Sequence, residues 1–336
     1  MNNYNCSICN SLTTKLSKTF KFTENSKFNW EHDSTMKLLS LREVKVQLRI
    51  CLKCFHLIIF PKFDASVLYG EEGPKIRKII YESYFPDKIY GQKRHQLSLK
   101  EDFSRLSRDL LRFSQITQFI AKHAESTFIG EKEIRILDWG GGDGYISSTY
   151  SSLLRTITGQ QVVNYIYDYT DWGNLEINKV GLNDLKKMEP FHIIIFSHVL
   201  EHSHNPLLDL NYGNSFLIDQ GIVICEVPDE RAWSTVRVIK RIRLGLHYHV
   251  HSFTRRSLHK LLECSDFKSI ATEYQYKSSY RGEKMHSIIG IAQKEQFYFT
   301  EKPPSFIYEC VSLIKAIAFA VTLKIFNKLK IVLQFK

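Results

Sequence analysis

Hydrophobic and polar residues alternate in blocks along the middle of the chain. Six short apolar runs, rich in β-branched and aromatic residues, predict strands at residues 134–137, 162–167, 193–196, 222–227, 267–276 and 286–293. Predicted helices begin at Gly144 and cover residues 206–218 and 255–265. Strands that alternate with helices are typical of a parallel sheet covered on both faces. The pattern therefore predicts an α/β fold with a Rossmann-like, doubly wound and mostly parallel sheet.

The segments outside this sheet divide the chain further. We expect an amino-terminal unit at residues 1–66, a connector with helices at 67–130, the sheet domain at 131–296 and a basic amphipathic helix at 297–336. Lysines interrupt the last part too often for a membrane-spanning helix. Packing on the domain, a partner helix and contact with an anionic membrane surface remain its three interpretations.

The composition narrows the class of protein but not its partner. Of the 336 residues, 43% are hydrophobic, enough for a catalytic-sized core and a small accessory unit. A formal net charge of +11 favours acidic partners such as nucleic acid or anionic lipid, although a dispersed excess also serves solubility. The chain opens without an apolar leader-like stretch, so we expect a cytoplasmic protein, peripheral to the inner membrane surface if its last helix binds lipid.

Four of the seven cysteines form two CxxC pairs, Cys6 with Cys9 and Cys51 with Cys54. Each CxxC turn places two thiolates on one side of a loop, and two such turns make the tetrahedral sulfur cage that zinc prefers. The interval between the pairs exceeds the roughly 15–20 residues of a compact zinc ribbon. Either a hairpin fills it, or the pairs have another role. We predict a structural zinc and a zinc-binding unit over residues 1–66.

The run ILDWGGGDGYISS at residues 136–148 places glycines between a predicted strand and a predicted helix. The dinucleotide pattern GxGxxG does not fit from either starting glycine, and the Lys of a phosphate-binding P-loop is missing. What fits is an acid followed by glycines at alternate positions, Asp138, Gly140, Gly142 and Gly144. This arrangement resembles the first motif of class I S-adenosylmethionine-dependent methyltransferases.

The resemblance implies S-adenosylmethionine as the cofactor. Amides of the glycine turn and the dipole of the following helix would hold its methionine carboxylate. Asp168, just after the second strand, would accept the ribose hydroxyls, with Asp171 as the alternative if that strand runs longer. The segment SHVLEHSHNP at residues 197–206 resembles the LEH segment of methyltransferases that act on small molecules, which implies that Ser197 lies beside the cofactor.

Two histidines are candidates for removing a proton from the methyl acceptor. His202 belongs to the LEH segment, and His251 matches a position where the family often has a His before a Phe and a Ser or Thr. A neutral imidazole accepts a proton near pH 7. The alternative for each is an ordinary surface or hydrogen-bonded histidine.

A zinc-binding amino terminus joined to such a domain also resembles the sugar C-methyltransferases of deoxysugar pathways. This implies methyl transfer to oxygen or carbon of a small molecule, with a sugar, nucleotide-sugar or cell-envelope glycan precursor as the acceptor. Two alternatives stay open: an RNA-modifying methyltransferase, and a non-catalytic zinc-containing interaction protein on a methyltransferase-like fold. Nucleic acid is the less favoured partner, and the four cysteines are the only metal ligands that the sequence predicts.

Overall fold

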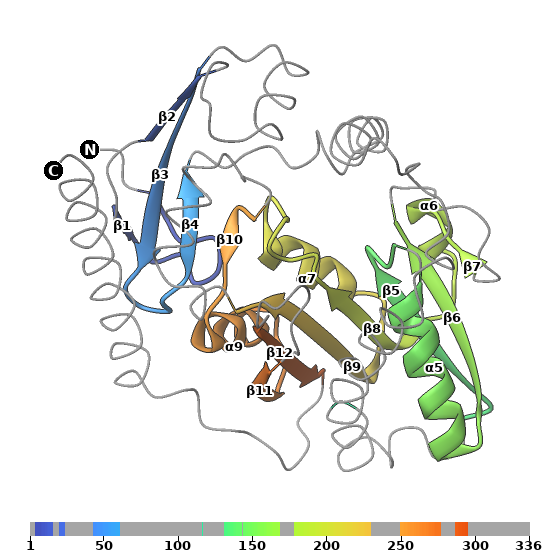
Figure 1. Ribbon diagram of the computed structural model, residues 1–336. Coiled ribbons are helices and arrows are strands. Elements are labelled where there is room, and N and C mark those ends of the chain that lie inside the picture. The colour runs from blue at the N-terminus through green and yellow to red at the C-terminus, as the bar shows by residue number, and fades with distance from the viewer. Residues whose placement is uncertain are drawn as a thin grey trace, which may run out of the picture.

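The protein is described by a computed structural model with two sheets (Figure 1). The residues that it describes are 4–15, 20–23, 43–60, 116, 131–142, 144–168, 178–229, 249–276 and 286–294. Most of the predicted connector, the alternative acid Asp171 and the predicted carboxyl-terminal helix lie outside these residues. Among the described helices, none is long and apolar enough to cross a bilayer.

The larger sheet has seven strands in the order β11-β12-β9-β8-β5-β6-β7. Their bounds are β5 (Glu133–Trp139), β6 (Gln161–Tyr167), β7 (Asn178–Lys179), β8 (Phe191–Ser197), β9 (Leu217–Pro228), β11 (Ser269–Tyr276) and β12 (His286–Gln293). Neighbouring strands from β7 to β9 pair in parallel, whereas β12 pairs antiparallel with both β9 and β11. The predicted mostly parallel sheet is thus confirmed, with an antiparallel pair at one end.

Local sequence signals set the ends of the helices that cover this sheet. The helices are α5 (Tyr145–Thr158), α6 (Leu182–Leu185), α7 (Pro206–Asn214) and α9 (Arg255–Cys264). The side chain of Asn205 caps α7, which has Pro206 in its first turn, and Thr254 with Ser257 forms a capping box on α9. The helix predicted over 206–218 is therefore right in its start but too long, because β9 already begins at Leu217.

Alternating side chains of β8 divide the core into two layers. Ile194 and Phe196 belong to one buried cluster, which also contains Leu210 of α7 and residues of α9. Ile193 and Ile195 point to the other face and belong to a second cluster, with side chains of α5. A strand buried on both faces reads as a continuous apolar run, which is why the sequence of β8 shows no polar alternation.

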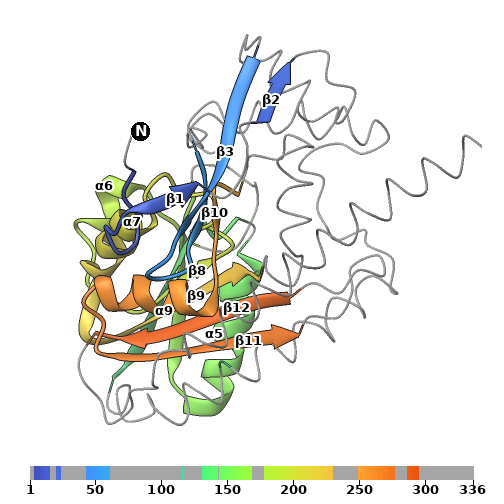
Figure 2. The ribbon, with the colours of Figure 1, turned by 90° about the vertical axis from the view of Figure 1, so that its left-hand side faces the viewer.

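The smaller sheet contains the amino-terminal strands and one short strand from far along the chain. It consists of β1 (Thr13–Lys15), β2 (Phe20–Thr23), β3 (Glu43–Cys51), β4 (Leu57–Phe60) and β10 (His251–Ser252). β3 pairs with β1, β2 and β4, and β10 pairs antiparallel with β4 (Figures 1 and 2). The segment just before α9 therefore completes the amino-terminal sheet and joins it to the larger one.

Two leucines of α7 provide a matched test of the core. Leu210 is fully buried, whereas 63% of Leu208 is exposed. We expect Leu210→Ala to lower the free energy of unfolding by about 2–5 kcal/mol, because it removes buried carbon and leaves a cavity. Leu208→Ala should change it by less than about 0.5 kcal/mol. Chemical denaturation followed by circular dichroism measures both, and equal losses would contradict this packing of α7.

Candidate functional site

The glycine turn follows β5 at the carboxyl edge of the parallel sheet. Gly140, Gly142 and Gly144 all have left-handed backbone angles, with φ of 68°, 57° and 70°. Residues with a Cβ rarely adopt this conformation, which explains why the glycines recur at alternate positions. The Gly140 amide donates to the Tyr167 carbonyl at 2.7 Å, so the turn is tied to the end of β6.

The predicted acids meet at this turn. Asp138 is buried, and its carboxyl group occupies the space that a side chain on Gly141 would need. Asp168 follows β6, and its Oδ2 accepts a hydrogen bond of 2.9 Å from the Gly142 amide. The structure therefore brings Asp168 and the alternate glycines to one place, as the sequence predicts.

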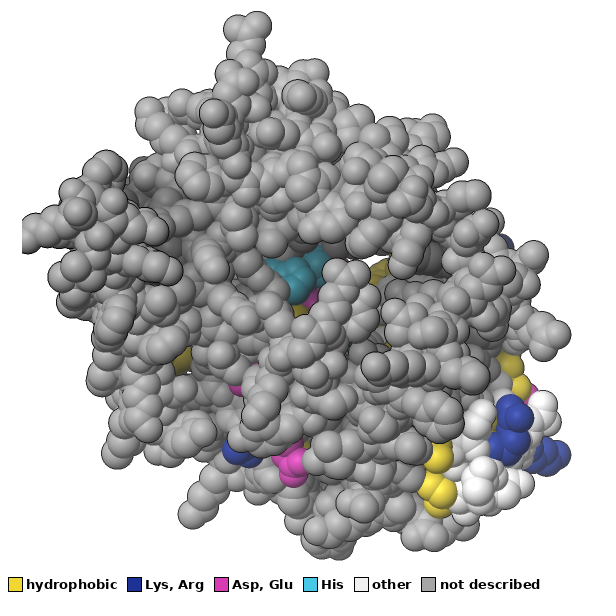
Figure 3. Space-filling view, in the orientation of Figure 1, with side chains coloured by type: hydrophobic (Ala, Val, Ile, Leu, Met, Phe, Trp, Pro, Cys, Tyr) yellow, Lys and Arg dark blue, Asp and Glu magenta, His cyan; other side chains and the backbone are white. Residues whose placement is uncertain are grey.

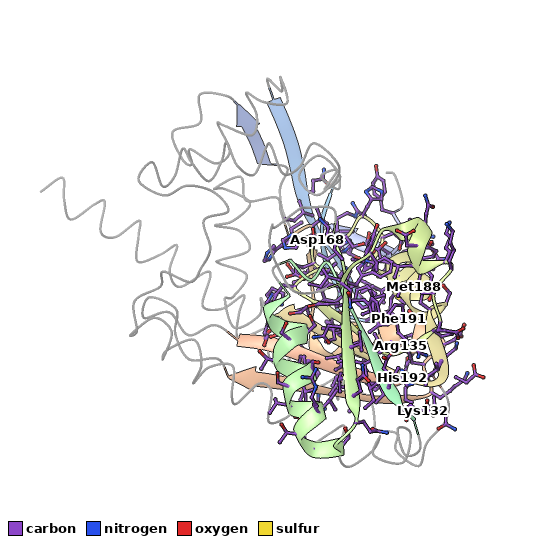
Figure 4. The ribbon with its side chains drawn as sticks, turned by 90° about the vertical axis from the view of Figure 1, so that its right-hand side faces the viewer. Lys132, Arg135, Asp168, Met188, Phe191 and His192 are labelled. Atoms are coloured by element: carbon purple, nitrogen blue, oxygen red, sulfur yellow. The ribbon has the colours of Figure 1, made fainter. Side chains whose placement is uncertain are left out.

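The opposite edge of the sheet carries polar residues with structural partners. Figure 4 shows His192 and Arg135 well separated from Asp168, toward the other end of the strands. Burial lowers the pKa of His192, and its Nδ1 accepts a hydrogen bond from the Arg135 backbone amide at 3.0 Å. This histidine thus joins neighbouring strands and lies apart from the candidate site.

The turn after β8 packs directly on the glycine turn. A Cβ added to Gly140 would lie only 2.7 Å from Cγ2 of Val199. The Ser197 hydroxyl donates to Oε2 of Glu226 at 3.1 Å, and the His198 amide donates to the Glu226 carbonyl at 2.8 Å. Ser197 is therefore placed in the turn that borders the glycines, although its side chain is engaged with β9.

His198 lies between two buried carboxylates. Its Nδ1 is 3.2 Å from Oε1 of Glu201, and its Nε2 is 3.7 Å from Oε1 of Glu226. Both glutamates are 1% exposed, and burial of a charged carboxylate needs such polar neighbours. His198 also has a φ of 58°, and left-handed angles at residues other than glycine often mark functional turns. Glu226 was not among the predicted site residues, and its one signal in the sequence is an acid inside an apolar strand.

Both predicted histidines lie close to Glu201. His202 is 18% exposed, with its Nε2 3.9 Å from Oε1 of Glu201, and its ring contacts that of His249. His251 is fully buried; its amide donates to the Glu201 carbonyl, and its Nδ1 lies 2.8 Å from Nε2 of His56. His56 and His249 were not among the predicted site residues. Only the pairing of β10 with β4 brings His56 to this place.

The four predicted cysteines converge in the amino-terminal sheet, with all their sulfur atoms within 4.8 Å of one another. The sulfur of Cys54 lies 3.7 Å from those of both Cys6 and Cys9, and the sulfurs of Cys9 and Cys51 lie 3.5 Å apart. Zinc–sulfur bonds of about 2.3 Å would place tetrahedral ligands about 3.8 Å apart. The donor set and its spacing therefore fit a structural zinc ion.

The two CxxC turns have the same backbone geometry. The amide of Asn10 donates to the Cys6 carbonyl at 2.9 Å, and that of Phe55 donates to the Cys51 carbonyl at 2.8 Å. Asn10 and Phe55 both have positive φ, which turns the chain sharply after the second cysteine of each pair. A hydrogen bond with Cys51 raises the pKa of the Cys6 thiol to about 12.

Alanine variants of two glycines distinguish the effect of crowding at the site from that of backbone strain. Gly140 and Gly159 have nearly equal φ, +68° and +69°, but nothing lies within 4 Å of a Cβ on Gly159. Alanine at either position carries the same left-handed cost of about 1–2 kcal/mol. We expect Gly140→Ala to lower the free energy of unfolding further and to weaken binding of S-adenosylmethionine, because the new methyl group would displace Val199. Denaturation and calorimetry measure these effects, and identical behaviour of the two variants would contradict the contact.

Two solved methyltransferase structures are among the proteins to which this chain is similar. The chain is 16% identical to the magnesium protoporphyrin IX methyltransferase of Synechocystis PCC 6803, solved with bound SAH, with a TM-score of 0.42 over 66% of this chain and 99% of that one. A putative methyltransferase from Bacillus halodurans C-125 is 14% identical, with a TM-score of 0.38 over 56% and 99% of the two chains. No curated protein matches the sequence. Residues 100–272, more than half of the chain, match a family described as a methyltransferase domain. The protein therefore belongs to this family and is a class I S-adenosylmethionine-dependent methyltransferase.

Proposed function

We propose that the enzyme methylates an oxygen or carbon atom of a small molecule, and that the acceptor is a sugar, a nucleotide-sugar or a cell-envelope glycan precursor. The observation that carries the cofactor part of this proposal is the hydrogen bond from the Gly142 amide to Asp168. It places a carboxylate against a turn without side chains, where an adenosyl ligand can lie on the backbone. The sugar part rests on the resemblance of the paired cysteines and the LEH segment to sugar methyltransferases.

The residues around the glycine turn suit S-adenosylmethionine in detail. Gly144 precedes α5, whose first amides and dipole favour an anionic group such as the methionine carboxylate. Asp168 would accept hydrogen bonds from the ribose hydroxyls, and Asp138 and Ser197 border the same turn. The bound cofactor supplies an activated methyl group on a sulfonium, so the protein has to align the acceptor and take up its proton.

His202 and His251 are the proposed proton acceptors. The ring of His202 is partly exposed and lies beside the buried Glu201 carboxylate, which would stabilise the protonated imidazole. The ring of His251 contacts that of His56. A proton that His251 takes from the acceptor could therefore pass on to His56. Between the two, the exposure of His202 favours it as the group that meets the acceptor.

We also propose that the four clustered cysteines bind a structural zinc ion. Four protein ligands leave no open coordination position, so this metal would hold the β3–β4 hairpin and the preceding CxxC turn together. Since β4 pairs with β10, the zinc would also support the segment that carries His251.

RNA modification is the second candidate, favoured by the net charge of +11. The structure offers no cysteine nucleophile for such a reaction on β9, because full burial raises the pKa of the Cys225 thiol. An RNA substrate would therefore need chemistry without covalent attack by Cys225.

Methyl transfer from labelled S-adenosylmethionine to nucleotide-sugars, glycan fragments and RNA tests the proposed function. We expect label in the sugar-containing acceptors, and we expect Asp168→Asn to weaken cofactor binding about ten- to hundredfold through loss of charged hydrogen bonds. Asp219→Asn, at a side chain that is 85% exposed, is the matched control and should change nothing. Label in RNA alone would favour the second candidate, and absence of cofactor binding would favour a non-catalytic protein.

Metal analysis tests the proposed zinc site. Cys54→Ser is expected to lose one equivalent of zinc per chain and to lower the unfolding temperature, because the remaining three thiols no longer close the cage. Cys264→Ser is the control, since Cys264 lies outside the cluster. Retention of zinc in Cys54→Ser, or its absence from the unaltered protein, would overturn this assignment.

A further inference from the structure

We infer that Glu201, His202 and His249 form a second metal site, for a divalent transition-metal ion. Each residue offers one ligand atom, and these atoms all lie within 4.8 Å of one another. Two imidazole nitrogens and one carboxylate oxygen suit manganese, iron, cobalt or zinc, whereas magnesium and calcium prefer oxygen ligands alone. None of the three residues belongs to the cysteine cluster. Glu201 and His202 follow β8 of the larger sheet, whereas His249 precedes β10 of the smaller sheet.

The turn after β8 supplies two of the three ligands. The His202 amide donates to the Val199 carbonyl at 3.0 Å, which fixes the turn. Oε1 of Glu201 lies 3.9 Å from Nε2 of His202, and the Glu201 side chain is 1% exposed. His198 already lies 3.2 Å from Oε1 of this buried carboxylate, and a divalent cation would add positive charge beside it.

Two backbone hydrogen bonds hold the third ligand in place. The Val250 carbonyl accepts from the Ile59 amide at 3.0 Å, and the His251 amide donates to the Glu201 carbonyl at 3.1 Å. The residue before them, His249, is thereby held between the amino-terminal sheet and the β8 turn. Its ring lies 4.6 Å from that of His202 at an angle of 79°, so the two imidazoles approach from different directions.

The three side chains need only a small rearrangement to bind an ion. Metal bonds of about 2.0–2.2 Å place neighbouring ligand atoms about 3.0–3.5 Å apart, so the set would contract by about an ångström. The two imidazoles are only partly buried, and rotation about their side-chain torsions can bring this about. Figure 3, in the orientation of Figure 1, shows histidine side chains near the centre of this face with part of an acidic side chain beside them.

The position of the site gives the ion a role, which rests on the proposed function: with His202 bound to the ion, His251 would be the remaining proton acceptor. Three protein ligands leave coordination positions open for an oxygen of the methyl acceptor, and a metal-bound hydroxyl loses its proton more readily. The turn that carries Glu201 and His202 also packs Val199 against Gly140. A metal here would therefore orient a hydroxyl-bearing acceptor next to the methyl donor.

Titration with Mn²⁺ tests the site without knowledge of the acceptor. Manganese prefers nitrogen and oxygen ligands, so it leaves a thiolate-bound zinc in place. We expect the protein to bind one equivalent of metal beyond the cysteine site. Metal analysis would find it as a second zinc in the purified protein, or titration would show it as loss of the electron paramagnetic resonance signal of free Mn²⁺. His249→Ala and Glu201→Gln should weaken this binding by more than about tenfold. His204→Ala, at an exposed histidine two residues beyond His202, is the matched control and should bind as the unaltered protein does.

Two measurements on the same samples keep the outcome clear. Circular dichroism and calorimetry with S-adenosylmethionine establish that each variant is folded and binds the cofactor. The inference is overturned if the unaltered protein binds no second equivalent, or if folded His249→Ala and Glu201→Gln bind it undiminished. Metal binding without methyl transfer to any acceptor would leave the site standing and overturn the proposed function instead.

Discussion

The parallel pairing of β8 with β5 on one side and β9 on the other is the constraint on which the candidate site depends. Parallel strands need crossover connections, so their carboxyl ends all reach the same edge of the sheet. The glycine turn and the β8 turn follow two adjacent strands, and Glu226 lies near the end of the third, so the three meet there. Strand order thus determines which strand ends meet at the site. The residue types at those strand ends then determine its chemistry.

A second link crosses between the two sheets. β10 pairs with β4, and the His251 amide next to this pairing donates to the Glu201 carbonyl. The amino-terminal sheet is therefore connected to the β8 turn by main-chain hydrogen bonds as well as by the contact between His56 and His251. This arrangement places the cysteine-containing unit in contact with the candidate site.

Much of this architecture follows from local patterns in the sequence. The strands that were predicted from apolar runs are present, and the alternate glycines are explained by their left-handed angles. The two CxxC pairs meet despite the long interval between them, which contains the antiparallel pair β2 and β3, the first of the two alternatives expected. Apolar runs, alternate glycines and CxxC turns are local patterns, so they can be recognised in a single sequence.

The features that were missed depend on long-range pairing. β10 is two residues long and has no apolar period of its own, so only its partner β4 defines it. His56 and His249 consequently had no visible connection with the LEH segment. The predicted helix over 206–218 ran on into β9 because Leu217 and Ile218 are apolar and fit either element until the pairing of Leu217 with Phe191 is known.

The pairing of β4 with β10 also has a consequence for synthesis of the chain. His251 follows His56 by 195 residues. At translation rates of about 5–20 residues per second, β4 emerges from the ribosome about 10–40 s before its partner. During that time the apolar run LIIF lacks its β10 partner along one edge, and such edges recruit other chains. We therefore expect the protein to depend most on chaperones during synthesis, after β4 has emerged and before β10 has been made.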